Sequence, residues 1–70
     1  MNSLNTVRLR SAIDESGITI TALAKKMGIS RESLYNKIDR KTEFTASEIG
    51  IVSNALHLTS ESRDAIFFGE

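Results

Sequence analysis

The stretch Thr21–Ile38 constrains the fold of this chain most, because its pattern predicts two short helices separated by a tight turn. In its first half, Leu23, Ala24 and Met27 recur at the spacing of one apolar helix face. Gly28 follows directly, and glycine tolerates the left-handed conformation in which many helices end. The stretch is therefore expected to begin with an amphipathic helix that stops at Gly28.

The second half of the stretch predicts a helix whose inner side carries Leu34 and Ile38. Ser30 precedes it, and a serine hydroxyl at that place accepts a hydrogen bond from a free amide of the first turn. Ile29 is an apolar side chain within the turn, and Ala24 is small enough to let two steeply crossing helices approach closely. The whole pattern is typical of a helix-turn-helix.

The run Leu23–Ile38 resembles the motif shared by phage repressors and Cro-type regulators. The chain as a whole also resembles the Cro-like modulators of repression of temperate phages of lactic-acid bacteria. This resemblance implies an all-α, compact five-helix domain of the lambda-repressor/Cro-like type, a single unit over residues 1–70 with its helix-turn-helix at about 20–38. The positions that match the buried and turn residues of the motif are Leu23, Ala24, Met27, Gly28, Ile29 and Leu34.

Two positions differ from the pattern that the resemblance leads one to expect. Ile20 stands where many family members have a glutamine that bonds a phosphate and braces the reading helix, and an apolar side chain does neither. Arg40 stands where related phage sequences often have glycine in the turn after the reading helix. At position 20 this sequence therefore suits a protein partner better than DNA.

Three more helices are predicted outside the central stretch. The first covers about Thr6 to Ser16, and another begins after Thr45, which forms a capping box with Glu48. A short last helix is expected over Ser60–Phe68, with Thr59 as its cap. A chain of 70 residues supports one domain and buries only roughly 60% of the surface of its unfolded form, so marginal stability is expected.

Several single residues complete the expected framework. Thr19 is suited to cap the helix Ile20–Met27, and the turn after Ile38 should deliver Phe44 to the core. Gly50, inside the fourth helix, costs about 1 kcal/mol against alanine and is interpreted as a mark of close packing.

Charge is distributed unevenly along the chain, although the net charge is zero. The region from Lys25 to Lys41 has a local balance of +4 and the remainder a balance of −4. A basic region that coincides with the two-helix stretch is the electrostatic footprint expected of a phosphate-facing surface. The alternative is that these helices simply carry solvated cations. The basic residues of the region are Lys25, Lys26, Arg31, Lys37, Arg40 and Lys41, and its acidic residues are Glu32 and Asp39.

The outward face of the helix Arg31–Ile38 carries side chains suited to reading base edges. Arg31 can pair with guanine, Asn36 with adenine, and Glu32 can accept from cytosine. Tyr35 lies on the same face, with a partly buried packing role as the alternative, and for Arg31 and Glu32 the alternative is a solvated arrangement. The predicted phosphate contacts are Lys26, Ser30, Lys37, Arg40, Lys41 and Thr42.

The end of the chain predicts an apolar contact surface. Ile66, Phe67 and Phe68 are consecutive, so a helix cannot bury all three in one small core. In Cro and repressor relatives the corresponding end of the domain often makes a symmetric dimer, so a homodimer is one expectation. The alternative is that Phe67 or Phe68 folds back over the first helix.

Other functional classes have little support in the sequence. There is no cysteine, which excludes disulfides and thiolate metal sites, and His57 has no metal ligand at a suitable spacing beside it. Neither an enzyme, a cofactor nor a bound metal is expected. No segment has the length or composition of a signal peptide or a membrane span, so a cytoplasmic location in a bacterial host is expected.

The function implied by the resemblance is that of a phage Cro-like transcriptional regulator, or antirepressor, in a lysis/lysogeny switch. Its partners would be double-stranded operator DNA, the phage repressor protein, or both. The competing hypothesis is a protein-interaction module that grips the repressor and masks or alters its operator binding without binding DNA itself. The residues expected at such an interface are Ile20, Arg31, Tyr35, Lys37, Ile66, Phe67 and Phe68.

Overall fold

Five helices make up the computed structural model, which describes residues 3–69. They are α1 (Thr6–Ser16), α2 (Ile20–Met27), α3 (Arg31–Ile38), α4 (Ala46–Ala55) and α5 (Ser60–Phe67). The described part of the chain has no strand, and it measures 28 × 25 × 20 Å along its principal axes. The predicted all-α fold of five helices is therefore confirmed.

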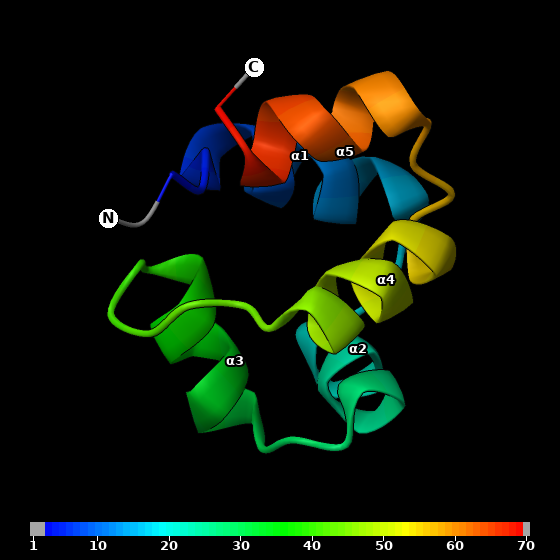
Figure 1. The fold of residues 1–70 in the computed structure, drawn as a ribbon. Helices are drawn as coiled ribbons and strands as arrows, with labels where there is room; N and C mark the ends of the chain where they lie inside the picture. Colours follow the sequence, from blue (N-terminus) through cyan, green and yellow to red (C-terminus); the bar gives the residue numbers. More distant parts are fainter. Residues whose placement is uncertain (1–2, 70) are drawn as a thin grey trace.

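The helices are arranged in two groups around one core (Figure 1). α1 packs beside α5, whereas α2 packs against both α3 and α4, and α1 also contacts α3. Five large side chains at the centre are fully buried, and they come from α1 to α4. These five residues are Leu9, Leu23, Leu34, Ile38 and Val52.

Side-chain caps begin all five helices. The hydroxyls of Thr19, Ser30 and Thr59 each accept the amide N–H three residues ahead, as predicted. Thr45 and Glu48 form the predicted capping box at the start of α4. Asn5 caps α1 in the same way, although the sequence pattern does not single it out. Local hydrogen bonding therefore fixes where each helix starts.

The ends of α2, α3 and α4 share one backbone arrangement. Gly28, Arg40 and His57 each follow a helix with a positive φ, of 71°, 67° and 53° respectively. At each end the next amide donates back to a carbonyl five residues earlier, as Ile29 does to Ala24. This pattern is the Schellman motif, in which glycine is the residue most favoured at the left-handed position. Arg40 and His57 occupy that position at a steric cost that glycine avoids.

The two ends of the described chain meet. The Asn5 amide donates to the Ile66 carbonyl over 2.7 Å, and the Ser3 hydroxyl donates to the Phe67 carbonyl over 3.1 Å. Leu4, between them, is 5% exposed and belongs to the core. The segment before α1 is thereby attached to the end of α5.

Gly50 corrects one prediction about packing. It lies on the exposed side of α4, and a Cβ atom built there would meet nothing within 4 Å apart from the helix itself. The interpretation of Gly50 as a close-packing residue is therefore wrong. The connection between α3 and α4 does deliver Phe44 to the core, where its ring meets Phe67 edge to face at a centroid distance of 5.2 Å.

No helix in the described part of the chain is long and apolar enough to cross a membrane.

Candidate nucleic-acid interface

The position of α3 is fixed from both of its ends and from its inner side. Leu34 and Ile38 are completely buried, and Ser30 caps the first turn by accepting the Ser33 amide at 3.1 Å. At the other end, the Thr6 hydroxyl of α1 donates to the Ile38 carbonyl over 2.7 Å. With its inner side held in this way, α3 turns its remaining face to solvent.

The four residues predicted to read bases lie on that outer side. Arg31 and Glu32, in the first turn, are exposed, and neither forms an ion pair within residues 3–69. Tyr35 is 36% exposed, and Asn36 is partly buried. The structure thus brings the four side chains together at the N-terminal and middle part of α3, with Asn36 the least accessible.

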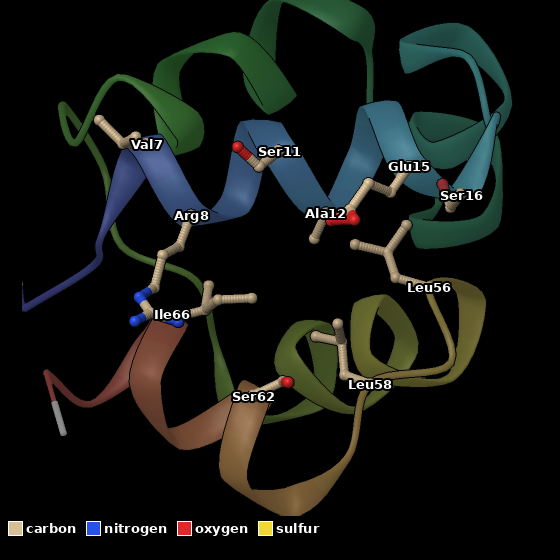
Figure 2. Close-up of a pocket in the computed structure, with 10 residues that line it drawn as sticks. All are labelled: Val7, Arg8, Ser11, Ala12, Glu15, Ser16, Leu56, Leu58, Ser62 and Ile66. Atoms are coloured by element: carbon tan, nitrogen blue, oxygen red, sulfur yellow. The ribbon is translucent and has the colours of Figure 1, made fainter.

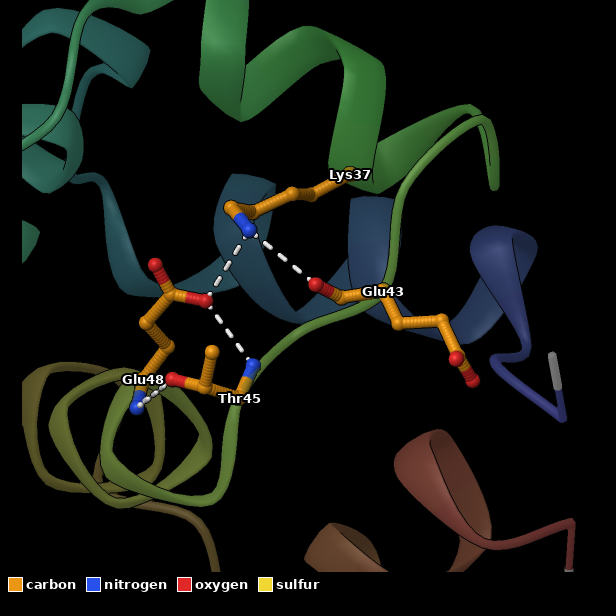
Figure 3. A network of polar contacts seen from close by, with 4 residues as sticks. All are labelled: Lys37, Glu43, Thr45 and Glu48. Carbon is orange, nitrogen blue, oxygen red and sulfur yellow. Dashed lines mark hydrogen bonds and ion pairs between the residues drawn. The ribbon is translucent and has the colours of Figure 1, made fainter.

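Lys37 does not belong to the solvent-facing set. Its Nζ lies 3.0 Å from Glu48 Oε1 and donates to the Glu43 carbonyl over 3.0 Å, and its side chain is only 14% exposed (Figure 3). The roles of Lys37 as a phosphate contact and as a partner contact stay predictions, and both would require its ammonium group to leave Glu48 and the Glu43 carbonyl. A lysine whose ammonium group is already engaged inside the molecule has to break those contacts before it can reach a ligand.

The carboxylate that receives Lys37 is part of the capping box of α4. Glu48 Oε1 also accepts the Thr45 amide over 2.8 Å, and the Thr45 hydroxyl accepts the Glu48 amide over 3.2 Å (Figure 3). Burial alone would raise the pKa of Glu48, but the hydrogen bonds from Thr45 and the Lys37 ammonium together outweigh it and lower that pKa. The last turn of α3 and the first turn of α4 are thereby joined through one ionised carboxylate.

The remaining predicted phosphate contacts are all exposed. Lys26 lies in the last turn of α2, Ser30 lies before α3, and the other three residues lie in the turn after α3. That turn is closed by the amides of Lys41 and Thr42, which both donate to the Asn36 carbonyl. The exposed residues of the turn are Arg40, Lys41 and Thr42.

Pairing inside the molecule sharpens the charge asymmetry on this side. Asp39, one of the two acidic residues of the basic region, forms an ion pair with Arg10 at 3.0 Å. Glu32, the other acidic residue of that region, forms no ion pair within residues 3–69. The exposed cations of the same region of the chain are Lys25, Lys26, Arg31, Arg40 and Lys41.

Ile20 lies beside α3 in a shallow depression of about 320 Å³. The side chain of Ile20 is partly buried and packs against the core, although it lies outside the apolar face formed by Leu23, Ala24 and Met27. Tyr35 borders the same depression, as do the charged residues Arg10 and Asp14. Its other apolar lining comes from Ile13, Ile18 and Ile38.

The apolar end of the chain is mostly internal. Ile66 is 3% and Phe67 6% exposed, whereas Phe68 is 51% exposed. The expectation that one of the three stays exposed is confirmed. The side chains of Ile66 and Phe67 pack in the core of this chain, so Phe68 offers the most surface of the three to a partner.

The described residues hold no cluster of possible metal ligands. Within residues 3–69, no three side chains of histidine, aspartate or glutamate are close enough to hold a metal ion. His57 is exposed at the end of α4. No family model, no curated protein and no solved structure matches the chain.

Proposed function

We propose that α2, the turn at Gly28 and α3 form a helix-turn-helix of the lambda-repressor/Cro-like type. On this proposal the chain is a phage Cro-like transcriptional regulator that binds operator DNA in a lysis/lysogeny switch. The observation that carries the proposal is the set of exposed cations that flank an outward helix face whose side chains are suited to reading base edges. A positive surface with such a face is what major-groove binding requires.

Each residue of the face has a distinct task in this proposal. Arg31 donates to guanine O6 and N7, Asn36 pairs with adenine N6 and N7, and Glu32 accepts from cytosine N4. Lys26 and Lys41, from the two sides of α3, bind phosphates and set the register of the protein on the duplex. The other phosphate contacts would be Ser30, Arg40 and Thr42, while Lys37 holds α3 on α4.

The test begins with selection of a bound sequence from random double-stranded DNA, followed by fluorescence-anisotropy titrations at several salt concentrations. Lys41→Ala should weaken all sequences alike and reduce the salt slope by about 0.9, because one phosphate contact is lost. Arg31→Ala should instead relax the preference at one base pair, by about 1–3 kcal/mol.

The matched control for both variants is Arg63→Ala. This substitution removes a cation on α5, where Arg63 pairs with Asp64 at 3.1 Å, and it should leave DNA binding unchanged. If no sequence is selected, or if Arg63→Ala weakens binding as much as Lys41→Ala does, the operator-binding proposal fails.

A second candidate is a protein-interaction module that binds the phage repressor. The observation that favours it is the depression beside α3, which the apolar Ile20 and the 36% exposed Tyr35 both line. Aromatic and apolar anchors in a pocket are typical of interface hot spots. An apolar side chain at position 20 also gives no hydrogen bond to a phosphate.

Calorimetry of the purified pair separates the two candidates. Ile20→Gln should weaken binding to the repressor by roughly 1–3 kcal/mol if the amide is buried there without a partner. Because Ile20 packs against the core, circular dichroism and thermal unfolding must first show that the variant is folded. Unchanged affinity in a folded Ile20→Gln protein would remove this depression from the repressor interface.

A further inference from the structure

The connection between α3 and α4, residues 39–45, carries three of the proposed phosphate contacts on a segment without helix or strand. These contacts are Arg40, Lys41 and Thr42, and all three are exposed. Surface connections of this kind are usually more mobile than the elements that they join, and ordering them on binding costs free energy. The way in which the connection is held in the free protein therefore affects how tightly it can bind phosphates.

The first part of the connection is closed against α3 by backbone hydrogen bonds. The amides of Lys41 and Thr42 donate to the Asn36 carbonyl over 2.9 and 3.3 Å. Arg40, just before them, has the left-handed backbone conformation that this closure uses, with a φ of 67°. No side chain takes part in these bonds, so the main chain alone fixes this end of the connection.

The last part of the connection is held by a side chain, that of Lys37. Its Nζ donates to the Glu43 carbonyl over 3.0 Å and lies 3.0 Å from Glu48 Oε1, in the first turn of α4 (Figure 3). Glu48 Oε1 also accepts the Thr45 amide over 2.8 Å. Figure 3 shows the Glu43 carbonyl facing the ammonium group and the Glu43 carboxylate pointing away from it. Lys37 therefore holds the main chain of the connection.

Close packing between α3 and α4 does not duplicate this link. Within residues 3–69 both helices pack on α2, but they do not pack closely on each other. The Lys37 side chain is only 14% exposed, so its two contacts are partly shielded from solvent. Because Asn36 and Lys37 are neighbours, both ends of the connection are tied to adjacent residues of α3.

We propose that Lys37 is a positioning residue for the DNA backbone, which fixes the connection between α3 and α4 so that Lys41 and its neighbours meet phosphates already ordered. The inference rests on the proposed DNA binding. In this role the Lys37 ammonium group stays on Glu48 and the Glu43 carbonyl and does not itself bind a phosphate. A preorganised segment loses less conformational freedom on binding, and its complex is tighter for that reason.

Fluorescence-anisotropy titrations at several salt concentrations separate positioning from direct contact. Lys37→Met should raise the Kd by about threefold to tenfold for the selected duplex and for an unrelated duplex alike, with an unchanged salt slope. Lys41→Met is the matched variant, because it makes the same change at an exposed lysine proposed to bind a phosphate. Its salt slope should fall by about 0.9. An equal fall for Lys37→Met would overturn the positioning role.

Glu48→Gln gives predictions of opposite sign for the two roles of Lys37. Glutamine also serves at this position of a capping box, so the variant keeps the start of α4 and removes the charge that holds Lys37. Positioning predicts a Kd raised by about twofold to fivefold, although the protein loses a negative charge. If Lys37 binds a phosphate, its released ammonium group should tighten the complex and steepen the salt slope. Unchanged or tighter binding by Glu48→Gln therefore overturns the proposal.

Two further variants control for the change in net charge. Glu43→Gln leaves the carbonyl that Lys37 binds. Glu15→Gln alters a side chain beside the hollow between α1 and α5, whose lining includes no residue of the connection (Figure 2). Neither Glu43 nor Glu15 forms an ion pair within residues 3–69, so neither variant should weaken DNA binding. Equal weakening by Glu15→Gln and Glu48→Gln would contradict the positioning role.

NMR relaxation of the free protein tests the anchoring without DNA. In Lys37→Met the backbone order parameters of residues 40–44 should fall towards about 0.6, while those of α2 stay near about 0.85. A loss of overall stability would not produce this local change, and thermal unfolding establishes that each variant is folded at the temperature of measurement. If the unaltered protein binds no duplex, the proposed function fails. If it binds one but residues 40–44 keep their order parameters in Lys37→Met, the positioning role fails.

Discussion

Lys37 of α3 and Glu48 of α4 form an ion pair at 3.0 Å in which both side chains are only 14% exposed. The other two ion pairs between residues 3 and 69 are formed by side chains that are 38–51% exposed. The Lys37–Glu48 pair therefore experiences less screening by solvent than they do. It also joins the helix proposed to read DNA to the helix that begins next in the chain.

Lys37→Met should destabilise the fold by about 1–3 kcal/mol, because it leaves a largely buried carboxylate without its cation. Urea unfolding of Lys37→Met, Glu48→Gln and the double variant forms a double-mutant cycle that isolates the pair. The coupling energy should exceed about 0.5 kcal/mol. Unchanged stability together with a lower salt slope for DNA binding would instead return Lys37 to the phosphate contacts.

The same pair predicts a dependence of stability on pH. The pKa of Glu48 in the folded protein lies below its ordinary value of 4.5, so the folded state prefers the ionised carboxylate. The resulting stabilisation is complete above the pKa of the unfolded chain and is lost as the pH falls through the lowered folded pKa. In thermal unfolding, the unaltered protein should have a higher Tm than Glu48→Gln at pH 7, and this difference in Tm should shrink as the pH falls towards 3. A constant difference across this range would contradict the lowered pKa.

Gly50→Ala should raise stability by about 1 kcal/mol, since alanine is the better helix former and its methyl group meets open space on the exposed side of α4. Gly28→Ala should have the opposite effect on stability. A Cβ at Gly28 also meets nothing within 4 Å, but its φ of +71° disfavours any side chain, so about 1–2 kcal/mol should be lost. Chemical denaturation measures both values, and equal signs for the two would contradict the explanation.

His57→Gly should stabilise the end of α4 by about 0.5–1 kcal/mol, because His57 has a φ of 53° at a position where glycine is free of steric cost. The imidazole is exposed, so its removal leaves no cavity. His57→Ala is the control in differential scanning calorimetry. His57→Ala keeps a Cβ atom in the left-handed conformation. If it raised stability as much as His57→Gly does, relief of the backbone conformation would not explain the gain.

The starts of the helices could be predicted because each depends on residues close in sequence. Thr19, Ser30 and Thr59 each cap a helix through an amide three residues away, and Thr45 with Glu48 forms a box of the same span. The apolar spacing of α2 and α3 likewise identified the side chains that are buried at their contact. Short-range hydrogen bonds and helical periodicity carry this information.

Contacts between distant residues could not be predicted in the same way. Lys37 and Glu48 are separated by a turn, so no periodicity shows that the lysine points inward. Arg40 and His57 adopt the left-handed conformation without being glycine. Their residue types therefore do not mark these two positions as the ends of helices. The burial of Ile66 and Phe67 depends on where α5 meets the rest of the core, which the sequence pattern of α5 does not contain. For the candidate site, the sequence predicted which side of α3 is exposed but not that the Lys37 ammonium group is engaged by Glu48.

The hydrogen bonds of Ser3 and Asn5 to the carbonyls at the end of α5 have a topological consequence. They make the described part of the chain, residues 3–69, a nearly closed ring whose two ends a short peptide linker would connect. Such backbone cyclisation would limit the unfolded ensemble much as a cross-link around a loop of this size does, a gain of roughly 4 kcal/mol for an unstrained linker. In a cyclic form, the exposed segment that connects α3 to α4 could be cut to create new termini, and the order of the helices along the chain would become a matter of choice.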